Sequence, residues 1–172
     1  MTFAKSLGAL GLSTALTVGF VVGCSKPETA APTAGAKSDV LVSTEPQGGV
    51  GVGEARKTAK DGSEVVVVGR IGGSEKPFVT GLAAFTIVDP KVPPCGADEG
   101  CPTPWDYCCE TNAVKENIAT IKLTDAAGKP LTTGAAELLG VKELATVVVK
   151  GTAKRGDDGS LSVTAHQVYV RK

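Results

Sequence analysis

The chain has 172 residues with 18 basic and 18 acidic side chains, and 4% of its residues are aromatic. This length predicts one domain with a tail rather than two full domains. The balanced charge and the few rings argue against a protein that binds nucleic acid or an acidic lipid surface. Such partners select a basic excess and stacking aromatic side chains.

The first 24 residues have the parts of an export signal. Lys5 supplies a positive start, residues 7–22 are mostly apolar, and the small residue Gly23 precedes Cys24. The apolar run has about 16 residues, fewer than the roughly 20 that a membrane-spanning helix needs. The motif Val21-Val22-Gly23-Cys24 resembles the lipobox of bacterial lipoprotein signals.

This resemblance implies that residues 1–23 are a signal peptide, cleaved before Cys24, and that the Cys24 sulfur and amine carry acyl chains such as palmitate. Each buried methylene contributes about 0.8 kcal/mol, so two or three chains hold a protein in a bilayer almost permanently. We therefore expect a protein anchored in the cell membrane or the outer membrane, facing the periplasm or the exterior. Ser25, which is not Asp, favours the outer membrane under an enterobacterial sorting rule.

Residues 24–50 are expected to form a lipidated, flexible tether. Positions 25–48 are rich in Ala, Thr, Pro, Gly and Ser and show no apolar period. Such a composition does not bury enough surface to offset the entropy lost on ordering. The short apolar stretch 39–43 could be a strand, but we interpret it as part of the linker.

The remaining residues, 51–172, predict five strands and two short helices. The predicted strands are rich in β-branched residues and are bounded by turn residues, and the helices show helical spacing of apolar residues. Gly69 inside the first strand suggests a bend or a bulge. Alternation in the last strand places Leu161, Val163, Ala165 and Tyr169 on one face. The strands are expected at 64–71, 84–89, 118–124, about 144–154 and 161–170, and the helices near 51–60 and at 135–139.

The order of these elements, with a helix between the third and fourth strands, resembles the OB-fold, a five-stranded Greek-key barrel. The stretches DGSEVVVVGRIGG, FTIVD and ATIKLTD resemble periplasmic bacterial OB-fold families. The resemblance implies an all-β barrel over residues 51–172. The chain departs from those families in a long insertion, residues 90–112.

The insertion is a loop rich in Pro and Gly that holds four of the five cysteines, Cys95, Cys101, Cys108 and Cys109. Export to an oxidising compartment favours two structural disulfides that order this loop. A bridge between Cys108 and Cys109 would be strained, because adjacent Cα atoms lie only about 3.8 Å apart. Two pairings stay open: Cys95–Cys108 with Cys101–Cys109, or Cys95–Cys109 with Cys101–Cys108.

A metal site is the alternative interpretation of the same cysteines. Four thiolates suit Zn²⁺, and a soft cluster also suits Cu(I) or an iron–sulfur centre. Asp106, Tyr107 and Glu110 add harder ligands nearby. The spacing lacks the C-x-x-C pair of a usual zinc ribbon and of thioredoxin-like redox enzymes. We therefore expect a disulfide-locked loop without a cofactor, with Zn or Cu binding as the alternative.

Five residues are further candidates for binding or catalytic groups. Trp105 and Tyr107 could form an aromatic binding platform, but we favour packing of Trp105 over the disulfides, which would seal the loop against the barrel. Arg70 and Lys122 could line a groove for single-stranded nucleic acid, as in other OB barrels, although an exported protein seldom meets that partner. His166, the only histidine, is expected to be solvated.

Motifs of common enzymes are missing from the sequence. It contains no G-x-S-x-G, H-E-x-x-H or P-loop lysine motif, and residues 49–53 have the wrong spacing for a dinucleotide loop. We therefore expect a non-enzymatic binding or interaction module that contacts a protein or a small ligand. A metal-binding lipoprotein is the alternative.

Overall fold

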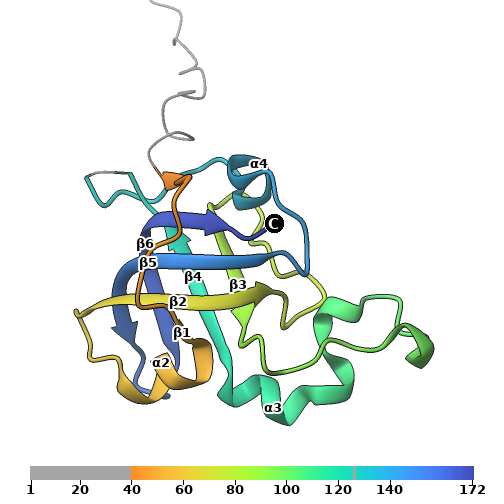
Figure 1. The fold of residues 1–172 in the computed structure, drawn as a ribbon. Helices are drawn as coiled ribbons and strands as arrows, with labels where there is room; N and C mark the ends of the chain where they lie inside the picture. The colour runs from red at the N-terminus through yellow and green to blue at the C-terminus, as the bar shows by residue number, and fades with distance from the viewer. Residues whose placement is uncertain (1–39, 126) are drawn as a thin grey trace, which may run out of the picture. The chain divides into compact units, whose positions relative to one another are not determined.

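The structure, a computed structural model, describes residues 40–125 and 127–172. These residues form a closed five-stranded β-barrel with a few short helices (Figure 1). The all-β, OB-like barrel predicted from the sequence is therefore confirmed. The signal peptide, Cys24 and the first part of the predicted tether lie outside the described residues. The barrel strands are β2 (Glu64–Ile71), β3 (Ala84–Val88), β4 (Ile118–Leu123), β5 (Thr146–Arg155) and β6 (Leu161–Val170).

The barrel closes because its first and fourth strands pair. β2 pairs antiparallel with β3, and β3 pairs antiparallel with β4. β4 then pairs in parallel with β6, and β6 pairs antiparallel with β5. Antiparallel pairing of β5 with β2 completes the ring, which is how barrels remove exposed sheet edges. With helix α4 (Ala135–Leu139) between β4 and β5, this order agrees with the OB-fold resemblance.

The helices are short and lie outside the barrel wall. Helices α2 (Val52–Thr58) and α4 occur where the apolar spacing predicted them, whereas α3 (Thr111–Glu116) was not predicted. Helix α3 begins inside the Cys-rich insertion and leads into β4. Within residues 40–125 and 127–172, no helix combines the length and the apolar character needed to cross a bilayer.

The core fills the barrel with side chains from alternate strand positions. Val67, Phe85, Ile87, Ile121 and Val163 have no exposed surface. Burying a side chain of this size contributes roughly 1.5–3 kcal/mol, so this interior supplies the main stabilisation of the barrel.

The main irregularity of the barrel lies between β5 and β6 rather than at Gly69. The pairing of β2 with β5 continues through Gly69 without a register shift, and a Cβ at Gly69 would lie 2.7 Å from the Cβ of Ile87. Glycine is needed there for close packing of strands, and the continuous register shows that the predicted bulge is not formed. The register shift occurs between Lys150 and Gly151, where β6 carries one extra residue.

This bulge exchanges the inner and outer faces of β6. Leu161, Val163 and Ala165 are buried, as the alternation predicted. Beyond the bulge, Val168 is buried and Tyr169 is partly exposed, so the prediction that Tyr169 shares the inner face is wrong. An inserted residue shifts a strand of period two by one position, and each following side chain changes face.

Residues 40–50 pack against the barrel instead of forming part of a tether. Val40 is buried in the core, and the Val42 N–H donates to the carbonyl of Val168 at 2.9 Å. Strand β1 (Val50–Gly51) then pairs in parallel with β2. The barrel domain therefore includes residues from at least 40, which corrects the predicted start at 51. Such a short apolar run has no periodicity from which to predict this packing.

The buried carboxylate of Asp89 holds helix α2 against the end of β3. Its Oδ2 accepts the N–H of Gly53 at 2.8 Å, and its Oδ1 accepts the N–H of Lys91 at 3.0 Å. The first N–H groups of a helix have no partner inside the helix, so a carboxylate is a favourable acceptor there. Asp89 thus links α2 to the chain that leads into the Cys-rich insertion.

Asp89→Ala is expected to lower the free energy of unfolding by about 1–3 kcal/mol, because two backbone N–H groups would lose their acceptor. Chemical denaturation followed by circular dichroism measures this loss. Asp157→Ala, in an exposed turn, is the matched control and should change stability by less than about 0.5 kcal/mol. If both variants were equally stable, the carboxylate would not be what holds α2.

Candidate metal centre

The Cys-rich segment, residues 90–112, connects β3 to β4 and projects from the side of the barrel (Figure 1). Proline and glycine prevent a regular strand here, as predicted. The segment is instead ordered by short turns that run into helix α3. The turns are the 3₁₀ segments η1 (Ala97–Glu99), η2 (Pro104–Asp106) and η3 (Cys108–Glu110).

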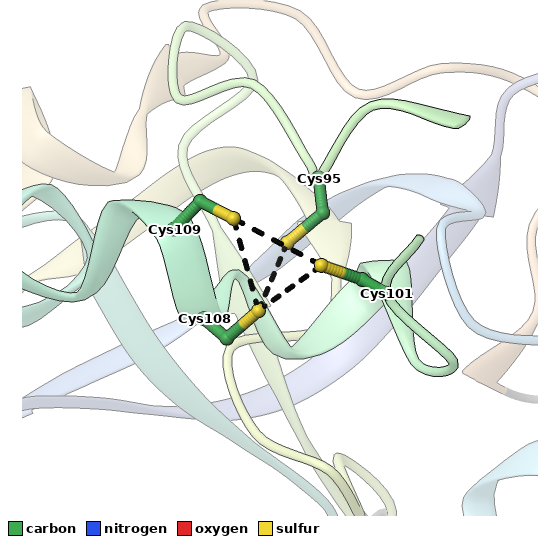
Figure 2. Close-up of side chains that lie close together, drawn as sticks. All are labelled: Cys95, Cys101, Cys108 and Cys109. Atoms are coloured by element: carbon green, nitrogen blue, oxygen red, sulfur yellow. Dashed lines mark hydrogen bonds between the residues drawn. The ribbon is translucent and has the colours of Figure 1, made fainter. Parts of the chain in front are cut away.

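The four cysteines of this segment converge on one point, as Figure 2 shows. The Sγ of Cys108 lies 3.3 Å from the Sγ of Cys101 and 3.4 Å from that of Cys95. The Sγ of Cys109 lies 3.8 Å from that of Cys108 and 3.9 Å from that of Cys101. All four sulfurs lie within 4.8 Å of one another, and we call this group the four-thiol cluster.

These separations fit a metal ion better than disulfide bonds. A disulfide holds its two sulfurs about 2.05 Å apart, whereas these four cysteines are free thiols. The expected disulfides are therefore not formed in this structure, because the loop brings all the sulfurs to one centre rather than joining them in pairs. A zinc ion bound tetrahedrally at about 2.3 Å would separate its sulfur ligands by about 3.8 Å. Four of the six sulfur–sulfur separations, at 3.3–3.9 Å, are close to that value, and the other two do not exceed 4.8 Å.

A sharp turn before Cys108 brings the two adjacent cysteines to the cluster. Tyr107 has a left-handed backbone (φ 59°, ψ 38°), which redirects the chain between η2 and η3. The Asp106 carboxylate fixes this turn, since it accepts the Cys108 N–H at 2.8 Å and the Thr103 hydroxyl at 2.7 Å. Hydrogen bonds from Thr103 and Cys108 lower the pKa of Asp106. Asp106 thus orients the turn and is not a member of the cluster.

Cys95 is the most buried cysteine of the cluster, and its surroundings favour the thiolate. It is 7% exposed, and its backbone N–H donates to the carbonyl of Pro104 at 3.2 Å. The backbone N–H of Cys109 donates to the Cys95 sulfur and lowers the pKa of the Cys95 thiol, because a donor favours the thiolate. The neighbouring Cys95 sulfur raises the pKa of Cys109 to about 12. A cation at the centre would replace the remaining thiol protons, since metals bind the thiolate form.

Tyr107 anchors the Cys-rich segment to the barrel. Its side chain has no exposed surface and packs in a small apolar cluster with Val88, Val92 and Val114. The Arg70 guanidinium donates to the Tyr107 hydroxyl at 3.4 Å and to the carbonyl of Val92 at 3.3 Å. Because the ring is buried, Tyr107 cannot belong to an exposed aromatic platform, which corrects that interpretation.

Trp105 and Gly72 form a second anchor, on the connection between β2 and β3. The Trp105 carbonyl accepts the N–H of Gly73 at 2.8 Å, and its indole N–H donates to the carbonyl of Glu75 at 3.1 Å. A Cβ at Gly72 would lie 2.5 Å from the Trp105 oxygen and 2.8 Å from the Tyr107 ring. Trp105 therefore holds the segment against the β2–β3 connection, although the disulfides that it was expected to cover are not formed.

The other residues singled out from the sequence lie apart from the cluster. Arg70 and Lys122 lie beside opposite ends of β3, so they do not line one groove. Arg70 serves the Tyr107 anchor, whereas Lys122 is exposed beside an apolar hollow. His166 is exposed, with its Nε2 4.0 Å from a carboxylate oxygen of Glu64.

Two residues that support the cluster were not predicted in these roles. Asp106 was considered as a hard metal ligand, but an Asp two residues before Cys108 is also a sequence signal for a turn in which the carboxylate accepts a backbone N–H. Gly72 carries no such signal, because only the fold brings it beside Trp105. The Asp106 turn could therefore have been predicted from the sequence, whereas the contact of Gly72 with Trp105 could not.

Gly72→Ala is expected to displace the Cys-rich segment, since the added methyl group would overlap the Trp105 carbonyl and the Tyr107 ring at a cost of roughly 1–3 kcal/mol. Amide hydrogen exchange should become faster at Gly73, while the β5 and β6 amides stay protected. Gly134→Ala is the matched control, because its new Cβ would have no neighbour within 4 Å. Unchanged exchange at Gly73 in the Gly72→Ala protein would show that this close approach is not required.

Comparisons with known proteins do not assign the chain to a family. No protein-family model matches the sequence, and a search of curated proteins gives no match. The functional argument therefore rests on the geometry of the four-thiol cluster and on the residues that hold it.

Proposed function

We propose that this protein is a lipid-anchored metal-binding protein that holds one Zn²⁺ ion through Cys95, Cys101, Cys108 and Cys109. One observation carries the proposal: four free thiols lie within 4.8 Å of one another and none is at bonding distance from another. Unpaired thiols that share a centre are the arrangement of a tetrahedral thiolate site.

The donor set favours zinc among the soft metals. The group consists only of cysteines, and a tetrahedral set of four sulfurs is typical of Zn²⁺ or of iron in iron–sulfur proteins. A cluster of several irons would hold its cysteines farther apart, because bridging sulfides and further metal ions would lie between them. The 3.3–3.9 Å separations leave room for a single ion. Cu(I) has the same preference for sulfur and is distinguished by elemental analysis.

The cellular location of the protein is proposed from its N-terminal sequence. The lipobox Val21-Val22-Gly23-Cys24 supports acylation of Cys24, and acyl chains would hold the barrel at a membrane surface outside the cytoplasm. Free thiols oxidise readily in such a compartment. A bound metal ion would protect the four loop cysteines, because coordinated thiolates are not available for disulfide formation.

Native mass spectrometry of the full-length protein should show one zinc ion per chain, with four free thiols in the loop after denaturation. Substitution of a residue that only supports the ligands of a metal typically lowers metal affinity by roughly 10–100-fold. Cys108→Ser should lower the zinc affinity by more than this, because Cys108 is proposed to bind the ion directly. Cys24→Ser, the same substitution outside the cluster, should bind zinc normally. Two disulfides and no metal in the native protein would contradict the proposal and favour a disulfide-locked loop.

The same two variants test the membrane anchor with their roles reversed. Cys24→Ser should leave the membrane fraction and lose incorporation of labelled palmitate, because no thiol remains for the lipid. Cys108→Ser should stay in the membrane fraction and keep the label. Retention of Cys24→Ser in the membrane, processed as before, would remove the support for lipid anchoring.

A further inference from the structure

We propose that the four-thiol cluster is an exchange site, which passes its metal ion to an acceptor that presents thiolate ligands at the exposed Cys108–Cys109 edge. This inference rests on the proposed function and concerns how the bound ion leaves. A structural zinc site contributes to folding itself, so its ion stays for the lifetime of the fold. An exchange site instead needs ligands that an incoming group can reach and a frame that persists without the ion.

The first feature that supports exchange is the exposure of half the ligand set. Cys108 and Cys109 are exposed and Cys101 is half-buried, whereas Cys95 is buried. The main apolar core of the barrel is built from other residues. An acceptor thiolate therefore reaches the ion from the Cys108–Cys109 side without any opening of the barrel.

The second feature is the unequal placement of the two exposed sulfurs. Cys108 lies 3.3 Å and 3.4 Å from the sulfurs of Cys101 and Cys95, near the middle of the group. Cys109 lies 3.8 Å and 3.9 Å from its neighbours Cys108 and Cys101. Of the two exposed sulfurs, Cys109 therefore lies farther from its neighbours, and we infer that it is the first to be displaced.

The third feature is that contacts independent of the ion hold the segment. The buried ring of Tyr107, the bonds of Trp105 to Gly73 and Glu75, and the Asp106 turn all form between protein groups. Loss of the ion would remove the sulfur–metal bonds and leave these anchors in place. The emptied cluster would keep its shape and could bind a new ion as long as its thiols stay reduced.

The exchange step is a substitution at the metal without any transfer of electrons. An acceptor thiolate forms a bond to Zn²⁺ as the bond to the Cys109 thiolate breaks, and the released thiolate takes a proton from water. Further acceptor ligands then replace the other three sulfurs in the same way. The acceptor is expected to be neutral or cationic overall, because four thiolates around Zn²⁺ are anionic and the stretch between Cys95 and Cys101 carries the exposed acidic residues Asp98 and Glu99.

Removal of zinc from the loaded full-length protein by the chelator 4-(2-pyridylazo)resorcinol tests this proposal. The rate of appearance of the coloured zinc complex should double when the chelator concentration doubles. Circular dichroism of the same samples should show that the barrel stays folded. A rate independent of chelator concentration and equal to the unfolding rate of the barrel would overturn the exchange proposal and leave zinc binding intact. A protein that never binds zinc would instead overturn the proposed function.

Two variants sharpen the result. Cys109→Ser should still bind zinc, more weakly than the natural chain, and should lose it to the chelator at a faster rate because one of the two exposed sulfur ligands is already missing. Gly134→Ala, far from the cluster in the sequence and without a close neighbour, should release zinc at the natural rate. Equal rates in Cys109→Ser and Gly134→Ala would show that Cys109 is not the ligand displaced first.

Discussion

Burial of the Tyr107 ring is the contact on which the Cys-rich segment depends. Its left-handed backbone costs about 1–2 kcal/mol for a residue other than glycine. Complete burial of a large side chain contributes roughly 1.5–3 kcal/mol, which offsets that cost. The same residue therefore fastens the segment to the barrel and turns the chain, so that Cys108 and Cys109 face Cys95. Without this anchor, the segment would be held to the rest of the protein mainly by the contacts of Trp105 with Gly73 and Glu75.

The barrel supplies a frame that does not need the loop. The β2–β5 pairing closes the ring of strands, and the core side chains come from those strands. The connection between β3 and β4 lies outside this ring and accommodates a long insertion, as surface loops generally do. Arg70 joins the two parts, because it lies on β2 and donates to Tyr107. This separation of frame and site would allow the ion of the proposed metal site to leave without loss of the fold.

Whether the cysteines suit disulfide bonds or a metal ion depends on how many other sulfurs lie close to each one. An even number of cysteines in an exported chain favours pairing, and the sequence alone led to that expectation. In the structure Cys108 has three sulfur neighbours within 3.8 Å rather than one bonded partner. A shared centre is an arrangement that a cation stabilises. The lack of a C-x-x-C pair argued against zinc only for the usual ribbon, because spacing along the chain does not limit which sulfurs a folded loop brings together.

The sequence by itself determined the strands and their order, because β-branched runs between turn residues indicate strands, and the resemblance of that order to the OB-fold implied the barrel. It also indicated which segment carries the chemistry, since four cysteines lie in one loop. Only the tertiary structure decided the inner face of β6 beyond the bulge, the packing of residues 40–50, the burial of Tyr107 and the role of Gly72. Each of these depends on contacts between segments far apart in the chain, and the local periodicity of a sequence does not predict such contacts.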